Sequence, residues 1–159
     1  MNKIHFPLRA AGTAAALALA LVANSPVQAA EDAKVITLTQ TGCQFVESEG
    51  GIDHGFKTNS AKDCEAINAK SGKDRLAKAK PLVLTPGKYV FRVTNKNVPY
   101  GLGFWLRGTG LGRVTLPGVS GGGLNTGVTQ DYVVDLKPGE YVYSCPLNPT
   151  PDYPLVVKG

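Results

Sequence analysis

The residues of this 159-residue chain that are best suited to chemistry are its three cysteines, Cys43, Cys64 and Cys145. A cysteine can pair in a disulfide, bind a soft metal ion as a thiolate, or pack as a small apolar side chain. Cys43 and Cys64 lie close together in the sequence. We therefore expect a disulfide between them, closing a loop of about twenty residues and contributing roughly 3 kcal/mol. Other pairings stay open, and an odd number leaves one cysteine unpaired in a monomer.

Enzyme motifs are absent from the sequence, and we therefore predict that the chain is not an enzyme. Ser120 lies in the sequence GVSGG, but no strand–turn–helix pattern surrounds it, as a nucleophile elbow would require. Outside residues 1–29 a single histidine, His54, is present to serve as a base. The glycine-rich sequence GTGLG at 108–112 is not followed by a helical pattern, so it does not predict a phosphate loop.

The N-terminus has the pattern of a cleavable signal peptide over residues 1–29. Lys3 and Arg9 form a positive start, residues 10–23 are apolar, and Ala29 ends a small-residue cleavage pattern. The apolar run is too short to cross a bilayer, and no later segment is long or apolar enough to do so. We expect export to the periplasm or the medium, no membrane span after cleavage, and a single domain over residues 30–159. An exported domain meets an oxidising compartment, where disulfides persist.

The charge of the predicted mature domain is mildly positive. Residues 30–159 hold 15 of the 17 basic residues and all 12 acidic ones, a net charge of +3 at pH 7. Basic residues gather between residues 57 and 80, but acidic residues interrupt them and no aromatic residues interleave. This pattern is typical of a solvated helix face, and it does not predict nucleic-acid binding.

The elements that must position these residues are mostly short strands joined by turns. Alternating apolar residues and Pro-Gly turns predict an all-β sandwich or barrel. Ser60 and Asp63 form a capping pattern that opens a helix ending near 71–72, with a second helical turn over 74–79, so a short helical insertion lies near residues 60–79. The glycine-rich residues 118–127 indicate a flexible connection or a bulged edge. The predicted strands are 34–39, 42–47, 82–84, 88–94, 101–106, 113–116, 128–136, 140–145 and 155–158.

Two segments in the second half of the chain resemble the cupredoxins, the Greek-key β-sandwiches that hold blue copper. Their sequences are LTPGKYVFRVTNKNVPY and GVTQDYVVDLKPGEYVYSC. The resemblance covers residues 83–159 and implies a cupredoxin-like Greek-key fold. It places Cys145 on the family's cysteine ligand and Tyr100 or Gly101 on its first histidine. The second histidine would fall near residues 147–149, and the axial methionine near Asp152 or Tyr153.

The chain departs from the family at these ligand positions. A blue copper site needs two imidazoles and a thiolate, usually with a weak axial thioether. Residues 30–159 contain His54 alone and no methionine, so a standard type 1 site cannot be assembled within one monomer. We predict no cofactor. Cys145 and His54 are the metal candidates, and copper is the metal they would bind.

Each metal candidate has a simpler structural interpretation. Cys145 is more readily explained as a buried structural thiol or a disulfide partner, although it could bind Cu(I) with His54 or a second, reduced cysteine. His54 follows Asp53 in a glycine-flanked loop, where a solvent-exposed histidine is the more frequent finding.

The proline-rich loop CPLNPTPDYP is the remaining unusual feature, because its prolines stiffen it at low entropic cost. The resemblance places it beside NVPYGLGFWLRG, where aromatic and arginine side chains of the hot-spot type gather. Alternation along residues 104–106 sends part of this group into the core.

We expect an exported binding or assembly protein that contacts a periplasmic or membrane-associated partner; the alternative is a non-standard copper-binding protein for copper handling or electron transfer through Cys145. The predicted partner-binding residues are Tyr100, Trp105, Arg107, Asn148, Asp152 and Tyr153.

Overall fold

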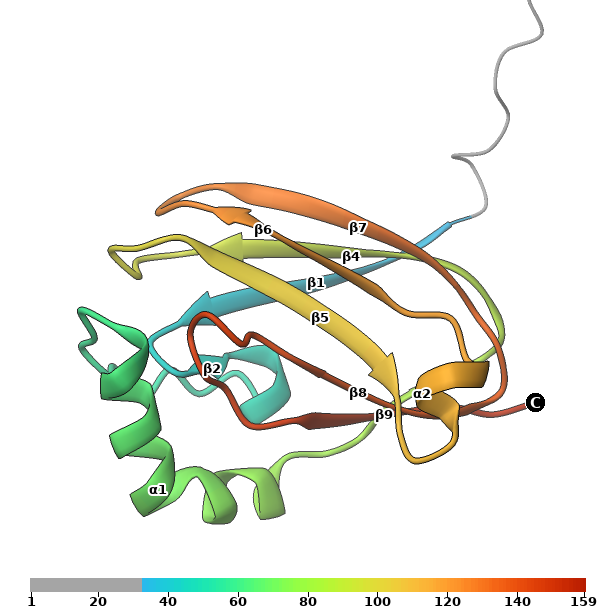
Figure 1. Ribbon diagram of the computed structural model, residues 1–159, viewed down its shortest axis with the longest axis horizontal. Coiled ribbons are helices and arrows are strands. Elements are labelled where there is room, and N and C mark those ends of the chain that lie inside the picture. The colour runs from blue at the N-terminus through green and yellow to red at the C-terminus, as the bar shows by residue number, and fades with distance from the viewer. Residues whose placement is uncertain (1–32) are drawn as a thin grey trace, which may run out of the picture.

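A computed structural model describes residues 33–159, so the predicted signal peptide lies outside the described residues. Within this range two mixed β-sheets pack as a sandwich, with a long helix at one end (Figure 1). The first sheet has the order β2-β1-β4-β7, formed by Gln44–Phe45, Lys34–Thr41, Gly87–Asn95 and Thr129–Leu136. The second has the order β3-β9-β8-β5-β6, formed by Leu82–Leu84, Tyr153–Val157, Gly139–Ser144, Leu102–Gly108 and Val119–Leu124. The helices are η1 (Glu47–Glu49), α1 (Ala61–Lys78) and α2 (Gly112–Thr115).

Both sheets are mixed because each contains one parallel strand pair. Strand β1 runs parallel to β4, and β3 runs parallel to β9, while the other strand pairs within residues 33–159 are antiparallel. The predicted sandwich is therefore confirmed as a two-sheet architecture.

The core lies between the sheets and follows the alternation of the strands. Strand β4 buries Tyr89, Phe91 and Val93 on one face, as the sequence pattern predicts. Phe91 stacks on Phe104 of the opposite sheet, with ring centroids 5.4 Å apart. Aromatic side chains therefore pack between the two sheets. Burial of each large ring contributes about 2–3 kcal/mol to the stability of the fold.

Helix α1 is one continuous helix, so the predicted end near Ser71–Gly72 is wrong. Its start is as predicted, since the Asp63 carboxylate accepts the N–H of Ser60 at 3.0 Å. A glycine inside a helix costs about 1 kcal/mol relative to alanine. The residues beyond Gly72 offset this cost, because Arg75 enters a buried ion pair and Leu76 packs against the core.

The segment predicted as a strand over 113–116 forms the short helix α2 instead. Its sequence is apolar enough for a strand, but the chain must reverse sharply after β5. Gly110 has a φ of +50°, and the N–H of Gly112 donates to the carbonyl of Thr109 at 2.7 Å. This turn directs the chain into β6, whose pairing with β5 is irregular between Leu102 and Phe104, so the interpretation as a bulged edge is confirmed.

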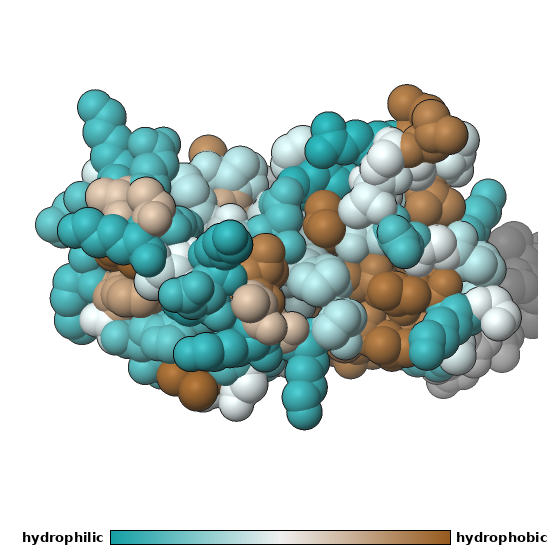
Figure 2. Space-filling model, turned by 90° about the horizontal axis from the view of Figure 1, so that it is seen from below, coloured by the Kyte–Doolittle hydropathy of each residue, from teal (hydrophilic) through white to brown (hydrophobic). Residues whose placement is uncertain are grey.

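The surface around α1 is mostly polar, whereas apolar side chains gather over the other half of the same face (Figure 2). Apart from Arg75, which is buried, the basic residues near 57–80 lie on this solvated surface. Among residues 33–159 we find no helix with both the length and the apolar character needed to cross a membrane.

Candidate functional site

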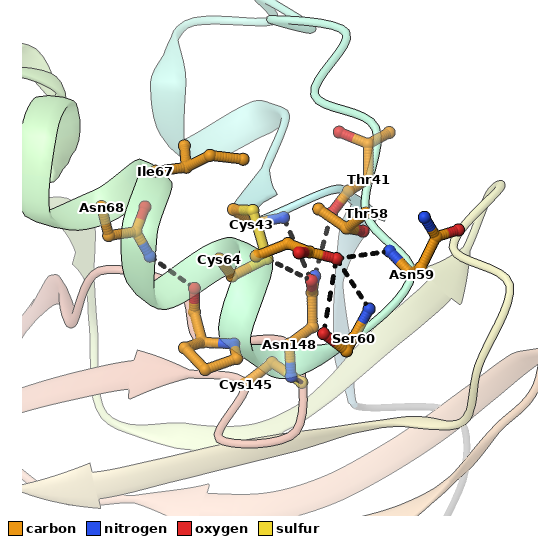
Figure 3. Close-up of a disulfide and its surroundings, with 12 residues drawn as sticks. Thr41, Cys43, Thr58, Asn59, Ser60, Cys64, Ile67, Asn68, Cys145 and Asn148 are labelled. Atoms are coloured by element: carbon orange, nitrogen blue, oxygen red, sulfur yellow. Dashed lines mark hydrogen bonds between the residues drawn. A yellow bond between two sulfur atoms is a disulfide. The ribbon is translucent and has the colours of Figure 1, made fainter.

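The predicted Cys43–Cys64 disulfide is present and joins the turn between β1 and β2 to helix α1 (Figure 3). The two Cα atoms are 5.0 Å apart, and both cysteines are fully buried. Cys43 has a φ of +61°, in the left-handed region that L residues seldom adopt. The disulfide anchors the helical insertion to the sandwich at the end where the loop after β8 lies.

Asn148 connects that loop to the β1–β2 turn (Figure 3). Its Oδ1 accepts the N–H of Cys43 at 3.1 Å and the hydroxyl of Tyr100 at 3.2 Å, and its Nδ2 donates to the carbonyl of Thr41 at 2.9 Å. The residue is 0% exposed. Asn148 was predicted to touch a partner, but the structure places it in the interior, because it satisfies backbone groups that would otherwise be buried without partners.

Cys145 directly follows β8 and is buried. Its Sγ accepts the backbone N–H groups of Gly103 at 3.4 Å and Asn148 at 3.3 Å. Burial raises the pKa of the Cys145 thiol, and these N–H groups lower it by a smaller amount. The thiol therefore stays protonated at neutral pH and resists acting as a ligand.

Tyr100 stands at the position that the resemblance assigns to the first histidine ligand. Its hydroxyl donates to Asn148 and lies 3.4 Å from Thr58 Oγ1. Burial raises the pKa of Tyr100. The side chains at the expected ligand positions are thus an amide and a neutral phenol held by hydrogen bonds, and this donor set does not fit a type 1 copper ion.

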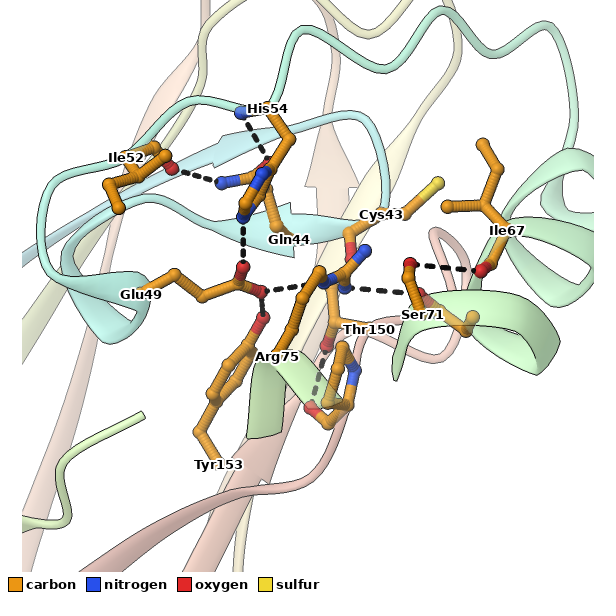
Figure 4. Close-up of polar contacts among 12 residues, drawn as sticks. Cys43, Gln44, Glu49, Ile52, His54, Ile67, Ser71, Arg75, Thr150 and Tyr153 are labelled. Carbon is orange, nitrogen blue, oxygen red and sulfur yellow. Dashed lines mark hydrogen bonds and ion pairs between the residues drawn. The ribbon is translucent and has the colours of Figure 1, made fainter. Parts of the chain in front are cut away.

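His54 belongs to a different cluster, centred on Glu49 (Figure 4). Its Nε2 lies 2.7 Å from Glu49 Oε2, and its ring stacks on Phe56. It is an exposed loop residue, as predicted, and its side chain is nevertheless held by Glu49. Within residues 33–159 no group of three or more His, Cys, Asp or Glu side chains is placed to hold a metal ion. The structure therefore does not combine His54 with Cys145.

Glu49 and Arg75 form a buried ion pair that sequence reasoning missed. Arg75 Nε lies 3.3 Å from Glu49 Oε1, and Arg75 Nη2 donates to the carbonyl of Cys43 at 3.0 Å. The Tyr153 hydroxyl also donates to Glu49. No sequence signal indicated this pair, because the two residues lie in η1 and α1, which meet only in the folded chain. The cluster fastens α1 to the sandwich.

Tyr153 must be removed from the predicted partner surface. It is 1% exposed, and both its burial and its hydrogen bond to Glu49 raise the pKa of its phenol. It begins β9, where alternation directs it into the core, so it cannot touch a partner in this structure.

Three of the predicted partner residues do come together at the surface. The Arg107 guanidinium lies 4.0 Å from the ring centroid of Trp105, which is 42% exposed. Arg107 Nη2 donates to both carboxylate oxygens of Asp152, at 2.7 and 2.8 Å, and Nη1 donates to Ser144 Oγ at 3.0 Å. We call Trp105, Arg107 and Asp152 the stacked triad. Trp105 and Asp152 are exposed, Arg107 is mostly buried between them, and hydrogen bonds to two separate segments fix its guanidinium.

Comparison with known proteins adds no assignment: no family model matches the chain, and no curated protein matches it in sequence. Function is therefore argued from the geometry of the site alone.

Proposed function

We propose that the chain is an exported binding or assembly module with a cupredoxin-like Greek-key sandwich, which acts without a standard type 1 copper site. It contacts a periplasmic or membrane-associated protein through the stacked triad. One observation carries the proposal: Trp105 and Asp152 are exposed and are held in place by Arg107, whereas Tyr100, Asn148 and Cys145 are occupied by internal hydrogen bonds.

The triad has the composition and rigidity of a binding hot spot. Tryptophan and arginine dominate hot spots because they bury large areas and form directed polar contacts. With 42% of its surface exposed, Trp105 offers about 100 Å² for burial, worth about 2–3 kcal/mol. Arg107 is held by three hydrogen bonds and by its stack on Trp105, so binding loses little side-chain entropy.

Alanine substitution of Trp105 tests the proposal. The full mature protein is immobilised and used to capture partners from a periplasmic extract, with Val133→Ala as the matched control. Val133 is 57% exposed on β7, in the other sheet. We expect Trp105→Ala to weaken capture roughly 30- to 150-fold, the loss that about 2–3 kcal/mol implies, and Val133→Ala to have no effect. Equal capture by Trp105→Ala and the unaltered protein would refute the proposal.

Copper handling through Cys145 is the competing function. The buried, protonated thiol gives it no support. Titration with Cu(I) and Cu(II) tests it directly, and stoichiometric binding that Cys145→Ser abolishes would reverse our ranking of the two functions.

A further inference from the structure

Two grooves lie on either side of Trp105 and share this residue and Ser120 in their walls. The first has a volume of about 250 Å³ and lies between the end of β5, α2 and the start of β6; Arg107, Arg113, Leu116 and Val119 help to line it. The second has a volume of about 330 Å³ and is lined by Gly121, Gly122, Pro146 and Leu147, among others. The two grooves therefore adjoin each other at Trp105 and Ser120.

The first groove carries positive charge that the protein does not neutralise. The charge of Arg107 is matched by Asp152, but within the described part of the chain Arg113 forms no ion pair. The Arg107 guanidinium is already engaged by Asp152, by Ser144 and by its stack on Trp105, which leaves Arg113 as the cation of this groove that has no ion pair among residues 33–159. A carboxylate suits the Arg113 guanidinium, because arginine binds planar anions through paired N–H donors.

The second groove is apolar and remains open because β6 is rich in glycine. Leu147 is 50% exposed beside Pro146. A Cβ atom on Gly122 would lie 3.9 Å from Leu147 Cδ1, which is an ordinary contact distance. A larger side chain at residue 122 would therefore occupy the groove without backbone strain. With glycine there, the groove can accept an apolar side chain of a ligand.

We infer that these grooves bind an extended acidic segment of the partner protein, with a carboxylate beside Arg113 and an apolar side chain against Leu147. This inference rests on the proposed function, whose partner class it specifies. Two adjoining hollows that share a wall suit alternate side chains of an extended chain, which point to the same side roughly 6–7 Å apart. The recognised pattern is therefore an acidic residue and an apolar residue separated by one position.

Trp105 reports binding directly, because it is the single tryptophan of the sequence. The full mature protein is titrated with the peptide acetyl-Gly-Asp-Ser-Leu-Gly-amide while tryptophan emission is recorded. A peptide with lysine in place of aspartate tests the charge, and sodium acetate tests whether a free carboxylate is sufficient. We expect the acidic peptide to shift the emission in a saturable way, with binding at least tenfold weaker for the lysine peptide and no shift with acetate. Added salt should weaken binding, since the contact is electrostatic.

Two variants separate the two grooves. Arg113→Gln removes the unpaired charge, and we expect at least tenfold weaker binding. Gly122→Val fills the apolar groove, and we expect binding to be lost. Lys88→Gln, on β4 in the other sheet, is the charge-matched control and should bind like the unaltered protein. Circular dichroism of each variant verifies that the fold is retained.

Several results would overturn the inference: no binding at millimolar peptide, equal binding of the acidic and lysine peptides, equal binding of acetate, or no effect of Arg113→Gln and Gly122→Val. Its failure is distinguishable from failure of the proposed function. If Trp105→Ala abolishes partner capture while the two groove variants leave it intact, the partner surface stands and the acidic-segment inference fails.

Discussion

Replacement of Asn148 by alanine would remove three hydrogen bonds from the interior at once. The N–H of Cys43 would lose its acceptor, and the Thr41 carbonyl and the Tyr100 hydroxyl would each lose a partner. A buried donor left unsatisfied costs about 1–3 kcal/mol, and each of the other two bonds contributes about 1 kcal/mol. We therefore expect a loss of about 3–5 kcal/mol in the free energy of unfolding.

Thermal and urea unfolding followed by circular dichroism would measure this loss. For a domain of this size a change of 1 kcal/mol shifts Tm by about 3–5 °C, so Asn148→Ala should lower Tm by roughly 10–20 °C. Tyr100→Phe removes only one of the three bonds and should cost about 0.5–1.5 kcal/mol. Leu147→Ala, at an exposed neighbouring position, should change stability by about 0.5 kcal/mol or less.

A change in Tm of less than about 2 °C for Asn148→Ala would refute this reasoning. If such a stable variant also lost partner capture, Asn148 would be a contact residue, as the sequence suggested, and its burial in this structure would not describe the functional surface.

The remaining predictions concern the helix anchor, the disulfide and the core tyrosines. Arg75→Met leaves the Glu49 carboxylate buried without its cation, and urea unfolding should show a loss of about 3–5 kcal/mol. Reduction of the Cys43–Cys64 disulfide releases a cross-link over 21 positions and should cost about 3 kcal/mol, measured as Tm with and without dithiothreitol. Burial raises the pKa of Tyr143 to about 12, so the native state holds this proton more tightly than the unfolded chain. Its contribution to stability is complete below pH 10 and is lost as pH rises toward 12, by about 2–3 kcal/mol in unfolding titrations.

Each of these predictions has its own control. Adding Glu49→Gln to Arg75→Met should recover part of the lost stability; no recovery would show that the loss comes from packing. A reduced protein with an unchanged Tm would mean that the disulfide does not constrain the unfolded chain. Tyr143→Phe should flatten the decline in stability above pH 10, and an unchanged decline would assign it to other groups.

Local patterns were sufficient to predict most of the sandwich. Alternation along β4, the Pro-Gly turns and the capping pattern at Ser60 each act over a few residues, so the sequence displays them directly. The same local reasoning failed at Gly72 and at residues 113–116. At Gly72 the outcome depended on a buried ion pair with a residue distant in the sequence. At residues 113–116 it depended on the reversal of the chain after β5.

In the candidate site, too, some properties followed from the sequence alone and others only from the fold. From composition alone, the single histidine and the lack of methionine in residues 30–159 excluded a standard blue copper site, because ligand chemistry requires those side chains wherever they lie. Which of the predicted partner-binding side chains are buried was decided only by the fold. Asn148 and Tyr153 had the residue types of a binding surface, yet both became internal hydrogen-bonding groups, whereas Trp105 and Asp152 remained exposed. The residue type determines which interactions a side chain can make. Its actual partners are determined by segments up to about a hundred residues away in the sequence, as in the hydrogen bond between Thr41 and Asn148.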